Sequence, residues 1–136
     1  MHTKTVLNLE DVKKIAAAAE AEAMANSWNV VISVVDDGGH LLWLQRMDGA
    51  APVSAHIAPA KAKVAALGRR ESKIYEDMIN NGRVSFLMAP ELQGGMLEGG
   101  VPILVNGETV GAVGVSGVKS AQDVQIAKAG IAALGL

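Results

Sequence analysis

The chain has 136 residues, a mass of 14.0 kDa, a formal net charge of -2 and a pI of about 5.9. This length predicts one domain over residues 1–136, with no room for a second. The balance of 12 basic and 14 acidic residues disfavours a nucleic-acid binder, and the 50% hydrophobic content disfavours a disordered chain. Cysteine is absent, which excludes disulfides, thiolate metal sites and a cysteine nucleophile.

Residues 8–25 predict an amphipathic helix with Asn8 as its N-cap and Asp11 three positions later. A β-branched run over 29–35 and a second run over 40–46 predict two strands, joined as a hairpin by the turn at 36–39. Residues 54–67 and 72–80 predict two further helices. Pro59 must lie in the first turn of the former or kink it, because proline has no N–H to donate.

Residues 84–88 predict a short strand, and residues 90–100 a glycine-rich loop. The pair Asn106-Gly107, between apolar runs at 101–105 and 109–116, predicts a second hairpin. Residues 120–134 predict a last helix, capped by Ser120 with Asp123 at the third position. This order of elements predicts an α+β fold in which helices pack on an antiparallel sheet of about five strands.

Small residues indicate how the helices pack. The first and last helices carry narrow apolar stripes that include Ala19 and Ala127, and the strand at 109–116 presents Ala112, Gly114 and Ser116 on one face. We predict that both helices lie on one face of the sheet, against these small residues. A valine at position 114 would then overpack the contact.

The N-terminal segment has no apolar stretch typical of a signal peptide, and no apolar run approaches the roughly 20 residues of a membrane span. We therefore expect a cytoplasmic protein. A mean hydropathy of +0.27 leaves little polar surface to cover a monomer of this size. This favours a homo-oligomer.

The residues alone indicate no catalytic group. His2, His40 and His56 lack the spacing of a metal site, so we expect none. Residues 114–118 resemble a nucleophile elbow around Ser116, but Val118 stands where its last glycine is required, which disfavours a serine hydrolase.

The glycine-dense segment at 93–102 lacks the Gly-Lys-Ser/Thr ending of a phosphate-binding loop. Glycines there and at 111, 114 and 117 permit close approach either of a ligand or of another backbone, and both interpretations stay open. Arg46, Asp48 and Lys61 are candidates to supply charge to a pocket.

Four segments in combination resemble one family. They are residues 33–41, 46–50, 99–103 and 110–117, followed by Gln122 and Asp123. Together they resemble the GlcG/HbpS-like family, which includes the C-terminal domain of PduO-type proteins. The resemblance implies a profilin-like α+β fold, homo-oligomers and, for some members, haem binding.

The resemblance makes haem or another tetrapyrrole the candidate cofactor. The ligand contacts that we expect, at a subunit interface, are Arg46, Met47, His56, Gly99, Gly100, Val101 and Pro102. His56, Met47 or Met96 could ligate the iron, and Arg46 or Lys61 could bind the propionates.

Three functional hypotheses follow. The first is a haem- or tetrapyrrole-binding accessory protein of a catabolic pathway, which the family resemblance favours. The second is a small-molecule catabolic enzyme, or its accessory subunit, acting on a hydroxy acid, a diol or an aldehyde. The third is a structural oligomer without a ligand.

Overall fold

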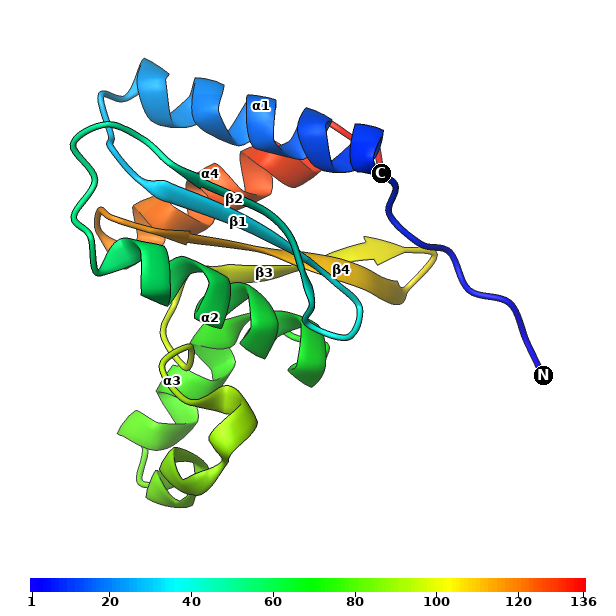
Figure 1. The fold of residues 1–136 in the computed structure, drawn as a ribbon. Helices are drawn as coiled ribbons and strands as arrows, with labels where there is room; N and C mark the ends of the chain where they lie inside the picture. Colours follow the sequence, from blue (N-terminus) through cyan, green and yellow to red (C-terminus); the bar gives the residue numbers. More distant parts are fainter.

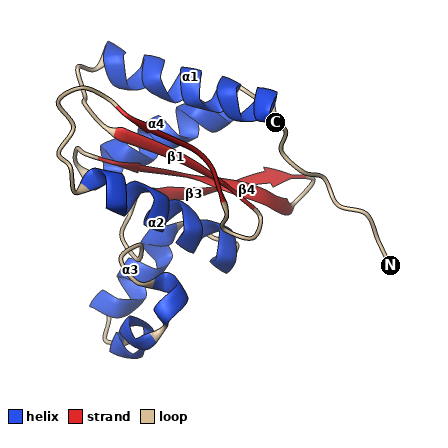
Figure 2. Ribbon diagram, in the orientation of Figure 1, coloured by secondary structure: helices blue, strands red, loops and turns tan.

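The computed structural model describes residues 1–136 and contains four helices, four strands and two short 3-10 segments (Figure 2). In chain order these are α1 (Leu9–Ala25), β1 (Val31–Asp36), β2 (Leu41–Arg46), α2 (Ser54–Gly68), α3 (Ser72–Asn80), η1 (Val84–Met88), η2 (Pro90–Leu92), β3 (Gly100–Val105), β4 (Glu108–Ser116) and α4 (Ser120–Ala132). The α+β class is therefore confirmed. No helix is both long and apolar enough to cross a membrane.

The strands form one antiparallel sheet in the order β2-β1-β4-β3. The expectation of about five strands is wrong by one, because residues 84–88 form η1 instead of a strand. This segment follows α3 closely, and Phe86 packs edge-on against Tyr75 with ring centroids 5.3 Å apart. That contact keeps the segment with α3, away from the sheet edges.

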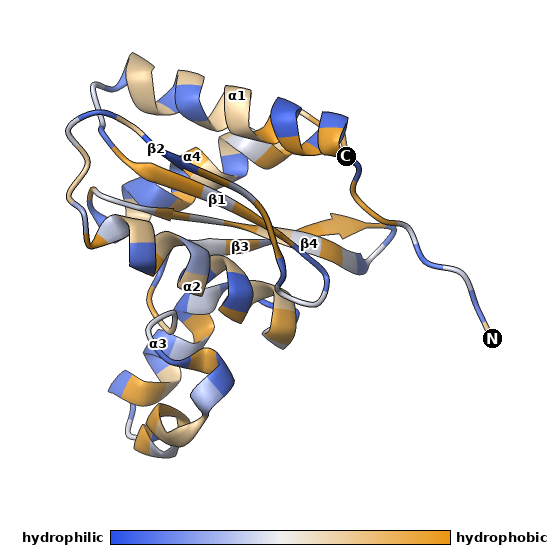
Figure 3. Ribbon diagram, viewed as in Figure 1, coloured by the Kyte–Doolittle hydropathy of each residue, from blue (hydrophilic) through white to orange (hydrophobic).

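Helices cover both faces of the sheet (Figure 1). α1 and α4 lie together on one face, as predicted, and α2 lies on the other, with α3 beyond it. Branched side chains fill the layer under α1 and α4, and hydrophobic residues run along the central strands (Figure 3). The largest of the fully buried side chains there are Val12, Ile15, Val30, Ile32, Val34, Ile103, Val113, Val115 and Ile126.

The small residues of β4 face α2, so the prediction that they face α1 and α4 is wrong. Ala112 packs with the alanines of α2, and a Cβ atom at Gly114 would lie 2.1 Å from the backbone oxygen of Ala58. The reason is the alternation of the strand: Val113 and Val115 take the α1/α4 side. The close approach was correctly anticipated, but with the wrong helix.

The helix caps test two further predictions. Asn8 and Asp11 form the expected capping box, since each side chain accepts the backbone N–H of the other residue. At α4 the N-cap is Lys119 instead of Ser120, and the side chain of Gln122 accepts the N–H of Lys119 at 3.2 Å. Pro59 lies inside α2, beyond its first turn.

Candidate functional site

The predicted ligand-contact residues lie at one end of the sheet. Arg46 pairs with Val31 of β1, Val31 pairs with Ser116 of β4, and Gly100 of β3 pairs with Gly114 of β4. β2 and β3 are nevertheless the two outer strands. Three strand spacings of about 4.8 Å separate them by about 14 Å, so one protomer does not gather these residues into a single pocket.

Arg46 and Met47 line a cleft of about 350 Å³ between the end of α1 and the end of β2. The Nε atom of Arg46 donates to the carbonyl oxygen of Ala50 at 3.2 Å, which orients the guanidinium and leaves its terminal nitrogens for a ligand. The other residues of this Arg46 cleft are Glu20, Met24, Asn29, Gln45 and Asp48. Sequence reasoning missed Met24, which lies at the end of α1.

His56 stands apart from this cleft. It lies in the first turn of α2, its side chain is exposed, and it lines none of the cavities. Its helix nevertheless begins at the same end of the sheet, because the hydroxyl of Ser54 contacts the hydroxyl of Ser116 at 3.2 Å. His56 could therefore contact a ligand bound over that end, but not one enclosed in the Arg46 cleft.

The glycines at the start of β3 pack against α2. Gly99, Gly100 and Val101 are buried, and Pro102 is half-buried. A Cβ atom at Gly100 would lie 2.2 Å from the backbone oxygen of Lys61, and one at Gly99 would lie 2.7 Å from its Nζ atom. The sequence left two interpretations open for these glycines, close approach of a ligand or of another backbone. Within the protomer, close packing against the backbone of α2 accounts for Gly99 and Gly100.

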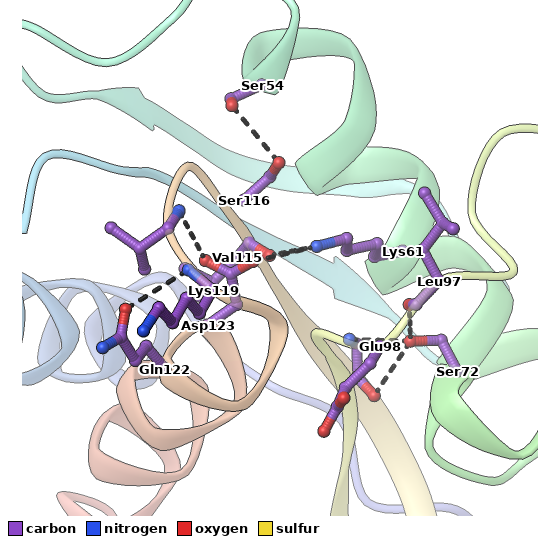
Figure 4. A network of polar contacts seen from close by, with 12 residues as sticks. Ser54, Lys61, Ser72, Leu97, Glu98, Val115, Ser116, Lys119, Gln122 and Asp123 are labelled. Carbon is purple, nitrogen blue, oxygen red and sulfur yellow. Dashed lines mark hydrogen bonds and ion pairs between the residues drawn. The ribbon is translucent and has the colours of Figure 1, made fainter. Parts of the chain in front are cut away.

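A buried ion pair lies behind these glycines. The ammonium of Lys61 donates to Asp123 Oδ2 at 3.1 Å and to the carbonyl oxygen of Val115 at 3.0 Å (Figure 4). Both charged side chains are at most 5% exposed. The suggestion that Lys61 binds propionates is therefore wrong, since its ammonium is enclosed and already partnered.

Asp123 connects this pair to the loop before α4. Its Oδ1 atom accepts the N–H of Val118 at 3.3 Å. Burial raises the pKa of Asp123, and the charge and hydrogen bond of Lys61 offset this only in part. Asp123, which was expected at the third position of α4 as the partner of a Ser120 cap, instead holds α2, β4 and α4 together.

Ser72 fixes the glycine-rich loop from the other side. Its hydroxyl accepts the N–H of Gly100 at 2.8 Å and donates to the carbonyl oxygen of Leu97 (Figure 4). The carboxylate of Glu76 accepts the N–H of Glu98 at 2.9 Å. Nothing in the sequence pattern distinguished these two residues from the rest of α3.

The largest cavity lies at the opposite end of the sheet and measures about 470 Å³. His2 and Lys4 line it from the N-terminal segment, and Arg69 lines it from the end of α2. Lys4 pairs with Asp37 at 2.9 Å, and Arg69 donates to the carbonyl oxygens of Asp37 and Ala66. We call this the N-terminal cavity; it contains His2, one of the three histidines of the chain.

The model of the family described as "haem degrading protein HbpS-like" matches residues 7–132. The chain belongs to the HbpS-like family. It is 55% identical to Protein GlcG of Escherichia coli strain K12 over 116 residues, which is 85% of each chain. The family resemblance seen in the sequence is thereby confirmed.

Two solved structures extend the likeness to the whole fold. A double mutant of Streptomyces reticuli HbpS superposes with a TM-score of 0.89 at 31% identity, covering all of this chain and 92% of the other. A complex of PduOC with haem superposes with a TM-score of 0.86 at 30% identity, covering 95% of each chain.

A haem site needs a side chain that can ligate the iron, most often through nitrogen or sulfur, together with cationic partners for the propionates and apolar walls. The Arg46 cleft offers the thioethers of Met24 and Met47 and the guanidinium of Arg46, so its donor set fits. Its walls are mostly polar, and one protomer therefore lacks the apolar cover. Met96, the other suggested ligand, is only 7% exposed in the cluster beside α3 and does not reach this cleft.

Proposed function

We propose that this protein is a haem- or tetrapyrrole-binding accessory protein of a catabolic pathway. The observation that carries the proposal is the likeness of the whole chain to a protein crystallised as its haem complex, within a family described as haem degrading. We also propose that the fold is profilin-like and that the protein is cytoplasmic. The absence of cysteine supports the cytoplasmic location.

In this proposal Arg46 would bind a propionate and Met47 would supply a sulfur ligand, with Met24 on the other wall of the cleft. Haem would supply redox-active iron there. His56 belongs to the helix that begins at the same end of the sheet, and it would contact a part of the ligand outside the cleft. Gly99, Gly100, Val101 and Pro102 act as a rigid backing, since the first three are buried.

A second copy of the chain would supply the apolar cover. β2 is an outer strand with three leucines that are 37–55% exposed, and Leu44 precedes Arg46 by two positions on the same face. Exposed apolar side chains on an outer strand favour pairing with another chain. We therefore propose a homo-oligomer, and we expect Leu44→Lys to lower the molecular mass measured by analytical ultracentrifugation.

Titration of the purified protein with hemin tests the binding function. We expect a saturable shift of the Soret band at micromolar protein, and its absence would contradict the function. Arg46→Ala should weaken the affinity about tenfold by removing a charge-assisted contact, and His56→Ala should weaken it less. Met47→Leu should change the position of the Soret band, because the iron loses its sulfur ligand.

Two controls locate the site. Met88→Leu makes the same chemical change at an exposed methionine outside the cleft and should leave the titration unchanged. His2→Ala tests the N-terminal cavity. If only His2→Ala weakens binding, the function stands but the site is the N-terminal cavity; wild-type affinity in Arg46→Ala and His56→Ala would also contradict the proposed site.

A further inference from the structure

A separate cavity of about 280 Å³ lies between α3, η1 and the glycine-rich loop. We call it the α3 pocket. It is lined mainly by apolar side chains, with two polar residues of α3 among them. Its residues are Glu76, Ile79, Asn80, Leu87, Gly94, Met96 and Leu97. None of them lines the Arg46 cleft or the N-terminal cavity.

The walls of the α3 pocket are held in place by packing against α2. A Cβ atom at Gly95 would lie 2.1 Å from the backbone oxygen of Ala60, so the loop lies directly on the helix. The next residue, Met96, is 7% exposed and packs in a cluster with Tyr75 and Val64. A ligand would therefore meet an apolar wall that is already formed.

Glu76 gives this apolar pocket a fixed negative charge. Its Oε2 atom accepts the N–H of Glu98 at 2.9 Å, which anchors the carboxylate and leaves its other oxygen free to accept a bond. The nearby charges are also mostly acidic. Lys73 lies near Glu76 and Glu98 and is attracted to both, but its ammonium is paired with Asp77 at 2.9 Å. One lysine among these three carboxylates leaves the surroundings of the pocket acidic.

We propose that the α3 pocket binds a small apolar molecule with a primary ammonium head. The ammonium would donate to Glu76, with the side-chain amide of Asn80 beside it, and the apolar part would lie against Met96 and Leu87. Taking for each non-hydrogen atom the roughly 30 Å³ that one water molecule occupies in the liquid, the cavity admits a molecule of on the order of ten such atoms. The site is independent of the tetrapyrrole function and can be tested without hemin.

Three probes of one chain length separate charge from apolar contact: hexylammonium, hexanol and hexanoate. The measurement is the NMR chemical shift of the Met96 methyl group at low salt, in wild type and three variants. Glu76→Gln removes the charge but keeps an oxygen that can accept the N–H of Glu98. Leu87→Ser weakens the apolar wall at a half-exposed position, and Glu91→Gln removes an exposed charge on η2 outside the pocket.

We expect a saturable shift with hexylammonium in the millimolar range, and an affinity about tenfold higher than for hexanoate, because the ammonium bond is charge-assisted. Glu76→Gln should abolish this preference, and Leu87→Ser should weaken hexylammonium and hexanol alike. Glu91→Gln should change the affinities less than about twofold, as expected of an exposed charge. Equal affinity for the three probes, no saturable shift, or a preference that survives Glu76→Gln would overturn the proposal.

Discussion

The two faces of the sheet are built in different ways. Under α1 and α4, branched side chains such as Ile32, Val113 and Ile126 fill the space between helix and strand. Under α2, Gly114 and the alanines leave almost no space, and the helix backbone lies directly on β4. One face is thus held by side-chain packing and the other by close backbone contact.

This difference decides where each face places polar groups. The α1/α4 face buries apolar atoms in a continuous cluster. At the α2 face, backbone carbonyl groups come close to the sheet, and the ammonium of Lys61 reaches across to the carbonyl oxygen of Val115 and to Asp123. Substitutions on the two faces should therefore lower the unfolding free energy for different physical reasons and by different amounts.

The largest expected effect is at the α2 face, in Lys61→Met. The methionine keeps most of the side-chain volume but leaves the Asp123 carboxylate buried without its cation. Removing one partner of a buried pair costs about 3–5 kcal/mol of unfolding free energy. Urea denaturation measures this loss, with the slope of the transition as a check on two-state unfolding.

The control for this prediction is the double variant Lys61→Met with Asp123→Leu. It removes both charges, so it should recover much of the stability that Lys61→Met loses, since buried pairs are often replaceable by apolar residues. A double variant no more stable than Lys61→Met would show that packing, not the unpaired charge, accounts for the loss.

Gly114→Val should have the next largest effect. The new side chain begins 2.1 Å from the backbone oxygen of Ala58, so α2 must move away from β4. We expect a loss of about 3 kcal/mol, the upper end of typical overpacking. Thermal unfolding followed by circular dichroism measures the shift, and an unchanged melting temperature would contradict the close contact.

Ile126→Val is the matching change on the α1/α4 face and should cost less. It removes one methylene from a fully buried side chain of α4, and such changes typically cost about 0.5–1.5 kcal/mol. The same thermal unfolding assay applies. A loss as large as that of Gly114→Val would contradict the distinction between the two faces.

The sequence allowed most of the sheet and the start of α1 to be predicted, because local turn and cap chemistry determines them. Asn106-Gly107 defines the β3–β4 hairpin, and Asn8 with Asp11 defines the start of α1. Residues 84–88 were misassigned because a short apolar run has no period that distinguishes a strand from a helical turn. Contact with α3, which is not visible in the pattern, decided their structure.

The polar centre and the site could not be predicted in the same way. Lys61 and Asp123 are 62 positions apart, and each alone is typical of a solvated or capping residue. For Arg46 and Met47, the sequence indicated the end of a strand but not the cleft, because Met24 comes from a different element. Which residues come together depends on which helix covers each face of the sheet. The sequence prediction placed α1 and α4 against the small residues of β4, where the structure has α2.

The smallest expected effect is a pH dependence that arises at the α2 face. Burial raises the pKa of Asp123 above its ordinary value of 3.8, and contacts with Lys61 and Val118 offset this only in part. The folded protein therefore holds this proton more tightly than the unfolded chain does. The contribution of the carboxyl to stability is most favourable below pH 3.8 and is lost as the pH rises through the raised value.

Asp123→Asn removes this titration and isolates its contribution. We expect the unfolding free energy of the wild type, minus that of the variant, to fall as the pH rises from about 4 and then to level off. Urea midpoints in a pH series at constant ionic strength measure this difference, in which groups common to both proteins cancel. Asp77→Asn, at an exposed carboxyl, is the matched control and should not reproduce the trend. A difference that stays constant or rises with pH would mean that the ion pair with Lys61 outweighs burial, and that the α2 face is stabilised by its charges.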